Sequence, residues 1–429
     1  MRNYSDTIFA LATKKSKSAI SVFRVSGKDT FNKVIKITKT KNIQKNRPKL
    51  TYIYDHNGNK VDQVVLTIFK SPKSYTGEDM AEISCHGSIA VINKISDTLL
   101  KSKLRIAEPG EFTKRALMND KINLLQAEAI NEVVNAETDN QRSIAIDNLG
   151  GRLGKYIGEI NKKLTKLLAD VEAIIDFSDE ELPKNLINEI KEQKRNIVDI
   201  LKKTIENSTL SKKIYTGYKI TIIGKPNTGK SSFINFINNK EVSIVTKIPG
   251  TTTDLVTSSL EIGGDKYTFV DTAGIRKHKN VIEKIGIEKG LESAKKSDLN
   301  LVFLQNNEIN SYKQIKNKIF IKSKYDKNKR KIKGVHNISN ITGYGIKSLL
   351  NKISKKNQIP KNNEPIFSRE RHLAGIKGAL FYLNKAEIKE IDIFAENVRS
   401  SIKSLDTINQ KFDIEKILDI IFSDFCIGK

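Results

Sequence analysis

The chain has few of the residues that would cross-link it or hold it in a membrane. Its 429 residues include 2 cysteines, 8 prolines and no tryptophan, and no stretch approaches the ~20 apolar residues of a membrane span. Cys85 and Cys426 lie far apart and outside any CxxC pattern, which argues against a disulfide framework or a cysteine zinc site. Residues 1–6 lack the basic-then-apolar layout of a secretion signal. We therefore expect a cytoplasmic protein without stable membrane insertion.

Acidic residues are in short supply relative to basic ones. Lys and Arg number 75 against 49 Asp and Glu, giving a net charge of +26. Such an excess favours polyanionic partners, because phosphate contacts release condensed counterions. The chain is also rich in Ile and Asn, as an AT-rich coding bias would make it, so charge alone leaves RNA binding open. The length suggests two to four domains.

The spacing of apolar residues divides the chain into four segments. Residues 1–119 carry short β-branched runs at 19–25 and 64–69, which predict an α+β domain. Apolar residues then recur every three or four positions to about Asn207, with a break at Gly150-Gly151, which predicts a first helical part over 120–215. Alternating strands and helices predict an α/β domain with a mainly parallel sheet over 216–356. Residues 357–429 are again helical in pattern, so we expect an α/β domain inserted into a helical one.

A phosphate-binding loop opens the predicted α/β domain. Residues 219–223 form a buried-strand run, residues 224–231 read GKPNTGKS, and a helical pattern follows. This is GxxxxGK[ST] in the strand–loop–helix context that the motif requires. Lys230 would reach the β and γ phosphates, the Ser231 hydroxyl would ligate Mg²⁺, and the helix N-terminus adds its positive dipole end.

Two further nucleotide-binding motifs lie downstream. Residues 260–270 predict a hairpin on a Gly263-Gly264 turn that leads into Asp271-Thr272-Ala273-Gly274. In P-loop enzymes an Asp at this strand end supports the Mg²⁺ shell and the Gly senses the γ-phosphate. The threonine cluster at 249–252 is placed to form the first switch. These motifs predict a nucleoside triphosphatase.

The choice of base depends on residues 323–326, Ser-Lys-Tyr-Asp, which follow an apolar run at 319–321. A carboxylate at Asp326 can accept from both guanine N1–H and the exocyclic amine, and adenine offers no such pair. The usual residue at position 323 is Asn. The motif therefore predicts GTP, although Ser323 weakens it.

Motifs outside this core resemble those of one family, the bacterial tRNA modification GTPase MnmE (TrmE) family. The resemblance runs essentially end to end, and it is most specific at the terminal Phe-Cys-Ile-Gly-Lys. The other segments that carry it are residues 23–27 (FRVSG), 74–79 (SYTGED), 109–116 (PGEFTKRA), 119–121 (NDK) and 126–130 (QAEAI).

This resemblance implies an N-terminal folate-binding domain that forms a homodimer, and a Ras-like GTPase domain inserted into a helical domain. It also implies a partner, an FAD-dependent protein of the MnmG (GidA) type, in a hetero-oligomer that acts on tRNA. Together they would add a carboxymethylaminomethyl-type group at C5 of the wobble uridine, from a tetrahydrofolate derivative. Hydrolysis of GTP would require Mg²⁺ and be stimulated by K⁺.

The resemblance also assigns residues to the GTP site. Glu283 would position the attacking water and Lys230 would act with it. Mg²⁺ would be held by Ser231 and Thr252, and K⁺ by Asn227, Thr246, Ile248 and Thr251. The GTP-binding residues would be Asn227, Thr228, Gly229, Lys230, Ser231, Ser232, Thr246, Lys247, Ile248, Pro249, Gly250, Thr251, Thr252, Asp271, Thr272, Ala273, Gly274, Ser323, Lys324 and Asp326.

In the first domain the resemblance assigns folate contacts to Arg24, Glu82, Lys121 and Lys429. A pterin offers a guanine-like donor edge to a carboxylate, and the folate glutamate tail calls for cations. The resemblance also implies that Cys426, in the terminal motif, is a catalytic residue near the folate and tRNA chemistry; apart from the motif, a lone cysteine is more often a buried hydrophobe. Cys85-His86 is interpreted as structural.

The sequence departs from the family pattern at four places. Thr253 stands where the first switch usually has Arg, and the segment from Gln305 to Lys318 is short. Ser323 replaces Asn, and residues 339–341 read Ser-Asn-Ile in place of Ser-Ala-Lys. We expect weaker nucleotide affinity or altered switching, with the chemistry retained.

Two other functions fit the same core motifs. One is a GTPase switch that binds RNA during ribosome assembly without modifying it, and the other is a GTP-regulated scaffold that binds no folate. An assembly factor would be expected to carry an appended RNA-binding module such as a KH domain with its GXXG loop, and the final helical segment lacks that loop.

Overall fold

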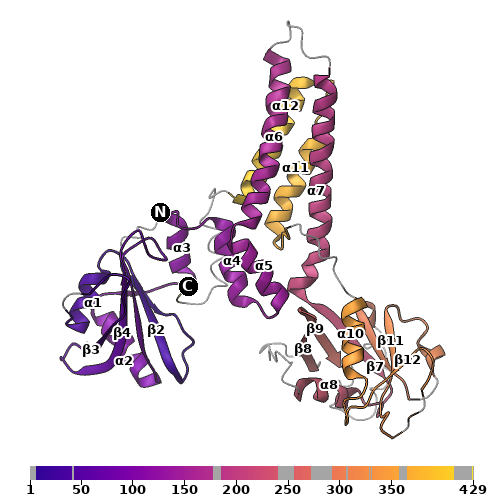
Figure 1. Cartoon of the computed structure of the whole chain (residues 1–429), viewed down its shortest axis with the longest axis horizontal. Helices are drawn as coiled ribbons and strands as arrows, with labels where there is room; N and C mark the ends of the chain where they lie inside the picture. Colours follow the sequence, from indigo (N-terminus) through magenta and orange to yellow (C-terminus); the bar gives the residue numbers. More distant parts are fainter. Residues whose placement is uncertain are drawn as a thin grey trace. The chain divides into compact units, whose positions relative to one another are not determined.

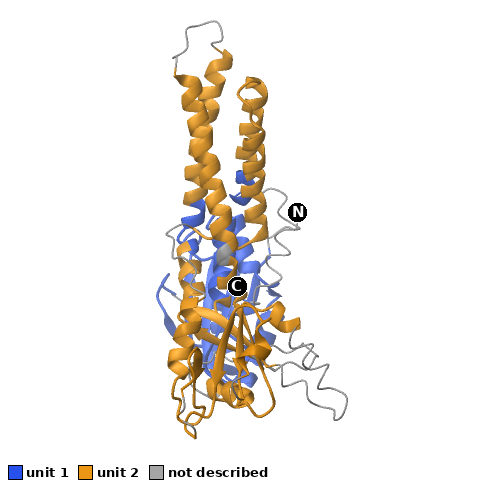
Figure 2. Cartoon of the chain, turned by 90° about the vertical axis from the view of Figure 1, so that its right-hand side faces the viewer, with its two compact units in different colours: residues 1–134, 148–154, 405–429 blue, residues 135–147, 155–404 orange. Residues whose placement is uncertain are grey.

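The computed structural model describes residues 6–40, 43–176, 185–239, 256–271, 292–305, 308–327, 329, 331–356, 365–409 and 428. The chain divides into two compact units (Figure 2). Unit 1 comprises residues 1–134, 148–154 and 405–429, and unit 2 comprises residues 135–147 and 155–404. Within the described ranges, no helix combines the length and the apolar character needed to cross a bilayer.

Unit 1 is built on a six-stranded sheet in the order β3-β4-β5-β2-β1-β6 (Figure 1). All neighbouring strands are antiparallel except β1 and β6. The predicted strands at 19–25 and 64–69 are confirmed within β2 and β4. The strands are β1 (Ile8–Leu11), β2 (Ser18–Ser26), β3 (Lys49–Tyr54), β4 (Lys60–Phe69), β5 (Met80–Gly87) and β6 (Arg105–Ile106).

Helices complete unit 1. In β4, Val64, Leu66 and Ile68 are buried at alternate positions, as expected for a sheet with one face against the core. These side chains share a core with residues of α1 (Thr30–Thr38) and α2 (Ile89–Lys101). Helices α3 (Glu111–Met118) and α4 (Leu124–Asn135) follow, with Leu117, Leu124 and Ala127 in a second cluster.

The helices of unit 2 come from both sides of the α/β segment. They are α5 (Asp139–Leu149), α6 (Arg152–Asp176), α7 (Leu186–Thr216), α11 (Glu370–Lys385) and α12 (Ile391–Asn409). The ends of three of these helices, residues 148–149, 152–154 and 405–409, belong to unit 1. The break predicted at Gly150-Gly151 separates α5 from α6. Figure 1 shows α6, α7, α11 and α12 running alongside one another, and Lys194 of α7 donates to the Ala386 carbonyl at 2.6 Å.

The helical pattern in the sequence stops before the helix does. It indicated helical character only to about Asn207, within a first helical part predicted over 120–215, and α7 continues to Thr216. The apolar spacing fades over this last stretch, which is rich in Lys and Thr, but the helix stops only where Gly217 adopts a positive φ of 75°. The glycine therefore ends the helix.

The α/β segment of unit 2 forms a second six-stranded sheet, in the order β12-β11-β10-β7-β9-β8. Every pair is parallel except the β8–β9 hairpin, so the predicted mainly parallel sheet and the predicted hairpin are both confirmed. The elements are β7 (Tyr218–Gly224), α8 (Lys230–Asn239), β8 (Val256–Ile262), β9 (Asp265–Asp271), β10 (Leu299–Phe303), the 3₁₀ helix η2 (Ile309–Tyr312), β11 (Lys318–Lys322), β12 (Val335–Asn337) and α10 (Ile346–Lys356).

The hairpin turn is fixed to α5 within unit 2. The Asn140 backbone N–H donates to the Gly264 carbonyl at 3.2 Å, and Asn140 Nδ2 donates to Asp265 Oδ1 at 2.9 Å. Lys266 forms an ion pair with Glu137 beside them. A side chain at Gly264 would come within 2.9 Å of the Asn140 amide, so this close approach requires glycine.

Candidate functional sites

The phosphate-binding loop lies between β7 and α8, as the motif predicts. Gly224 has φ +152° and a Cβ there would lie 2.4 Å from the Phe303 carbonyl oxygen of β10. Gly229 has φ +92°, and a Cβ there would lie 2.6 Å from Ser323 Oγ. Both glycines are therefore required by close contacts as well as by backbone conformation.

The ammonium group of Lys230 lies inside the curl of this loop. Its Nζ donates to the carbonyl oxygens of Gly224 at 2.8 Å and Lys225 at 2.7 Å, and the residue is buried. Thr228 Oγ1 also donates to the Lys225 carbonyl, at 2.8 Å. A phosphate oxygen is a stronger acceptor than a neutral carbonyl, so an incoming phosphate can take over these bonds.

Two oxygen ligands of the kind that Mg²⁺ prefers meet at the end of the loop. Ser231, at the start of α8, donates from Oγ to Asp271 Oδ2 at 3.4 Å. Asp271 ends β9, in register with Ile222 of β7. A hydroxyl and a carboxylate at this spacing fit an ion that keeps several waters and binds phosphate oxygens. The structure thus brings together two residues that the sequence placed 40 positions apart.

Three side chains from the base-recognition loops hold the phosphate-binding loop through its carbonyls. Ser323 Oγ donates to Thr228 O at 2.6 Å, and Lys324 Nζ donates to Asn227 O at 3.0 Å. Asn340 Nδ2 donates to Gly229 O at 3.0 Å. Asn227 is exposed with φ 62°, and Ser232 is exposed on the first turn of α8.

No role for Asn340 was predicted from the sequence. Its amide and the Ser323 hydroxyl both donate to the phosphate-binding loop. Compared with the usual motifs, this chain therefore lacks the Asn at position 323 and has an additional Asn at position 340. Among the residues that the structure describes, Asn340 Oδ1 is buried without a hydrogen-bond partner. The signal was present in the sequence as two departures from the usual motifs, but only the fold shows that both side chains reach one loop.

Asp326 is held in the ionised form that guanine recognition requires. Its Oδ1 accepts a hydrogen bond from Ser339 Oγ at 2.6 Å, and this bond lowers the pKa of the Asp326 carboxyl below its usual value. Asp326 itself is exposed and Ser339 is buried. The bond fixes one carboxylate oxygen and orients the group at the mouth of the site.

A second set of predicted residues meets in unit 1. Arg24 of β2 lies opposite Glu82 of β5 in the strand register. Its Nε and Nη2 donate to Glu82 Oε1 at 3.1 and 2.8 Å, and its Nη1 donates to the Gly428 carbonyl at 3.1 Å. The guanidinium lies 5.2 Å from the Tyr75 ring centroid and 5.7 Å from that of Phe112. Two aromatic faces and an ion pair thus hold one cation.

Lys121 lies near this set without joining it. It makes no hydrogen bond or ion pair with Arg24 or Glu82, although all three are described. Its stem packs at Gly77, where a Cβ would come 3.0 Å from Lys121 Cγ. Gly77 belongs to the same loop as Tyr75, so Lys121 borders the loop that covers Arg24.

A buried arginine, missed by the sequence analysis, supports this loop. Arg115 of α3 is 1% exposed. Its Nη2 donates to Asp6 Oδ1 at 2.7 Å and Glu111 Oε1 at 3.0 Å, and its Nη1 donates to Glu78 at 3.2 Å. Burial works to raise the pKa of Glu111, but bonds from Arg105, the Glu108 N–H and Arg115 outweigh it and hold that pKa below its usual range. Glu78 belongs to the SYTGED motif, and Glu111 and Arg115 belong to PGEFTKRA. In the sequence, both motifs served only as marks of the family resemblance, and no contact between them was predicted.

Cys85 and His86 agree with a structural role. Cys85 is buried, and burial together with Asp62 raises the pKa of its thiol to about 11. His86 Nδ1 lies 2.8 Å from Asp62 Oδ1. Across the part of the chain that is described, no three His, Cys, Asp or Glu residues are grouped to hold a metal.

The remaining predicted site residues lie outside the described residues. They are Thr246, Lys247, Ile248, Pro249, Gly250, Thr251 and Thr252 of the first switch, Thr272, Ala273 and Gly274, Glu283, Cys426 and Lys429.

Comparison with known proteins agrees with the two-part architecture. The model of the GTP-binding protein TrmE N-terminus matches residues 7–121, and that of the MnmE helical domain matches residues 124–426. The tRNA modification GTPase MnmE of Fervidobacterium nodosum is 38% identical over 99% of this chain and 98% of its own length. The proteins of the same name from Pelagibacter ubique and Aquifex aeolicus are 38% and 36% identical, each over 99% of this chain and 100% of their own length. The chain belongs to the MnmE family of tRNA modification GTPases.

Proposed function

We propose that this chain, a GTPase that acts in tRNA modification, helps to add a carboxymethylaminomethyl-type group at C5 of the wobble uridine of certain tRNAs. The carbon would come from a tetrahydrofolate derivative bound in unit 1. The observation that carries the proposal is that each unit holds a cationic side chain in position to bind an anionic ligand. These are Lys230 in the phosphate-binding loop, and Arg24, which is paired with Glu82 and lies near two aromatic rings.

In the GTP site each described residue has a separate task. Lys230 would exchange its two carbonyl acceptors for β- and γ-phosphate oxygens. Ser231 and Asp271 would hold Mg²⁺, which neutralises charge on the phosphates. Asp326 would accept from guanine, while Ser323, Lys324 and Asn340 keep the phosphate-binding loop against the base loops.

The catalytic step depends on residues outside the described part of the chain. We propose that Glu283 orients the attacking water and that Thr252 completes the Mg²⁺ ligands. A K⁺ ion bound by Asn227, Thr246, Ile248 and Thr251 would neutralise transition-state charge, as an arginine finger does in other GTPases. Asn227 is exposed at the edge of the loop, which suits such a role.

The role of K⁺ is tested by turnover in different salts. GTP hydrolysis is measured in equal concentrations of KCl and NaCl, with Mg²⁺ constant. A faster rate in K⁺ is expected, and Asn227→Ala should reduce the difference. Equal rates in the two salts would remove the cation mechanism.

In the folate site, Glu82 can accept from the donor edge of a pterin and Arg24 supplies a cation. Lys121 and Lys429 would meet the glutamate tail. The test is binding of a formyl-tetrahydrofolate to the purified protein and to Lys121→Ala, followed by fluorescence or calorimetry. Weaker binding by the variant is expected, because Lys121 borders the loop over Arg24. Unchanged binding would argue against this pocket.

We further propose that the protein is a homodimer that works with an FAD-dependent partner of the MnmG type, and that the GTPase domain is inserted into the helical one. The packing of α11 and α12, which follow the α/β segment, beside α6 and α7, which precede it, supports the insertion.

The alternative is an RNA-binding GTPase switch of ribosome assembly. The GTP site fits it equally, but the paired Arg24 and Glu82 would then have no ligand to bind. Absence of folate binding to the full-length protein, with GTP hydrolysis intact, would favour this alternative.

A further inference from the structure

Half of the net positive charge of the chain lies in about one ninth of its length. Residues 309–356 contain 14 Lys and Arg and a single acidic residue, Asp326, for a net +13 out of +26. The other 381 residues carry 61 basic and 48 acidic residues. A coding bias toward Lys would add lysines along the whole chain and would not remove Asp and Glu from one segment. The excess is therefore a local property of the region from η2 to α10.

Most of these lysines are exposed. Those of the β11–β12 connection are Lys324, Lys327, Lys329, Lys331 and Lys333, and those of α10 are Lys347, Lys352, Lys355 and Lys356. In the ranges that the structure describes, no carboxylate forms an ion pair with Lys347, Lys352 or Lys355. Surface lysines usually alternate with acidic residues, so an uncompensated row of cations is unusual.

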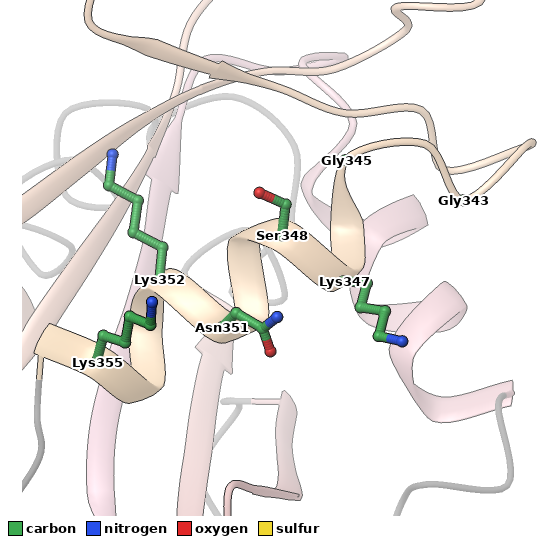
Figure 3. Close-up of a pocket in the computed structure, with 7 residues that line it drawn as sticks. All are labelled: Gly343, Gly345, Lys347, Ser348, Asn351, Lys352 and Lys355. Atoms are coloured by element: carbon green, nitrogen blue, oxygen red, sulfur yellow. The ribbon is translucent and has the colours of Figure 1, made fainter.

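Helix α10 presents these cations on one face. Ser348, Asn351, Lys352 and Lys355 follow the three- and four-residue spacing of a single helix face. The opposite face carries Ile346, Leu349 and Ile353 into the core of the sheet. The polar face borders a shallow hollow of about 670 Å³, and Figure 3 shows Lys347 near one end of the helix and Lys352 and Lys355 near the other, with Ser348 and Asn351 between them.

The length of this row suits a repeating anion. Lys347 and Lys355 are eight residues apart on the helix, which corresponds to roughly 12 Å. A nucleic acid strand presents one phosphate per ~3.4 Å of duplex axis, so the row spans several phosphates and exceeds a single small ligand. Tyr344, between the two glycines that border the hollow, is 48% exposed and stacks on Tyr325 with ring centroids 4.6 Å apart. An exposed ring beside lysines can also stack with an unpaired base.

We propose that the exposed lysines of α10 and of the described part of the β11–β12 connection form a surface that binds the phosphate backbone of RNA. The identity of that RNA as the tRNA substrate rests on the proposed function. The GTPase part of the chain would then contact the tRNA directly, with α10 contributing cations and Tyr344 a stacking surface.

The test compares two triple variants of the full-length protein. Lys347→Ala/Lys352→Ala/Lys355→Ala removes three charges from α10, and Lys162→Ala/Lys163→Ala/Lys166→Ala removes three exposed charges from α6. Binding of fluorescent tRNA is measured over a range of salt concentrations. We expect the α10 variant to bind about 10- to 100-fold more weakly, and its log–log salt dependence to be shallower by about two to three. The α6 variant should change less than about threefold.

Three outcomes would overturn the proposal. Equal losses in both variants would mean that only net charge matters, and no loss in the α10 variant would exclude this surface. If vesicles containing anionic lipid bind the unaltered protein and not the α10 variant, while tRNA binds both, the surface serves a membrane. GTP hydrolysis without tRNA should be unchanged in both variants, because none of these lysines lies in the GTP site.

A third variant covers the case in which the α10 variant is unstable. Lys327→Ala/Lys329→Ala/Lys331→Ala removes the same charge from the β11–β12 connection and should also weaken tRNA binding. If the unaltered protein binds tRNA and the α10 variant binds it more weakly, but the unaltered protein supports no modification, the proposed function fails while the RNA-binding role of this surface stands.

Discussion

The two candidate sites hold their cations in different ways. In unit 1, Arg24 is bonded to the carboxylate of Glu82 and lies near two aromatic rings. In unit 2, Lys230 donates to the backbone carbonyls of Gly224 and Lys225. A carboxylate keeps its cation in place with or without ligand, whereas neutral carbonyls yield to a phosphate. The first site is thus ordered in advance, and the second exchanges partners when its ligand arrives.

Removal of the exchanging cation should give the largest effect. Lys230→Ala is expected to lower GTP turnover at least about 100-fold, because a positioned donor on developing charge is worth that much in other enzymes. Lys225→Ala is the matched control in the same loop, since Lys225 is exposed and pairs with Glu308 at 2.7 Å. It should change turnover less than about threefold. Similar losses in both variants would contradict the role given to Lys230.

Removal of a fixed carboxylate should instead affect stability. Glu111→Gln removes the most buried of the three carboxylates that pair with the buried guanidinium of Arg115, so we expect the free energy of unfolding to fall by about 3 kcal/mol at neutral pH. Glu292→Gln, which breaks an exposed pair with Lys296, is the control and should cost less than about 1 kcal/mol. Urea unfolding of both variants measures these two free-energy changes. Equal changes would mean that the cluster of Arg115 with Asp6, Glu78 and Glu111 does not act as a buried network.

The same cluster predicts how stability depends on pH. The pKa values of Asp6 and Glu111 lie below their usual 3.8 and 4.5, because bonds from Arg105 and Arg115 outweigh the effect of burial. Their contribution to stability is therefore complete above about pH 5 and is lost as the pH falls through the lowered values. The Glu111→Gln variant should lose less stability between pH 5 and 3 than the unaltered protein. If both proteins lost stability to the same extent over this pH range, the cluster would not be the source of the pH dependence.

Replacement of the pre-ordered cation should weaken folate binding and spare GTP hydrolysis. Arg24→Ala is expected to reduce affinity for a formyl-tetrahydrofolate about 10- to 100-fold, since a charge-assisted bond is lost and Glu82 is left unpaired. Arg142 is an exposed arginine that pairs with Asp139, three residues earlier in α5, and Arg142→Ala should have no effect. If Arg24→Ala binds the formyl-tetrahydrofolate as tightly as the unaltered protein, Arg24 is not the cation that binds folate.

The smallest effect concerns the bond between the base loops and the phosphate-binding loop. Asn340→Ala should raise the KM for GTP about fivefold with kcat nearly unchanged, because one bond to the Gly229 carbonyl is lost. Adding Ser323→Asn, which restores the usual residue, should recover most of that loss. Asn351→Ala is the control on exposed α10. Failure of Ser323→Asn to compensate would mean that positions 323 and 340 act independently.

The sequence predicted those parts of the molecule whose signal is local. The strand at 219–223, the loop after it and the hairpin on Gly263-Gly264 each have a short pattern with one favoured conformation, and all three are confirmed. The helical pattern indicated α7 only to about Asn207, because the apolar spacing fades before the helix stops at Gly217. Apolar periodicity does not report buried polar residues, and this last stretch buries Ser208 as well as Ile214.

Contacts between distant positions could not be read from the residues alone. Arg24 and Gly428 are 404 positions apart, and only the resemblance to a family suggested that the C-terminal segment reaches the first sheet. Arg115 was missed because charged residues are seldom fully buried, and two of its three carboxylate partners, Asp6 and Glu78, come from distant segments. Asn340 was noted as a departure, but its bond to Gly229 depends on two loops meeting at one edge of the sheet.

Strand β9 joins two features that would otherwise seem unrelated. Its last residue is Asp271, beside Ser231, and the turn before its first residue is the one held by Asn140 of α5. The strand is hydrogen-bonded on both sides, to β7 and β8, and so resists stretching or bending along its length. A displacement of the Asp271 backbone along the strand would be transmitted to the turn that Asn140 holds, so β9 connects the GTP site with α5.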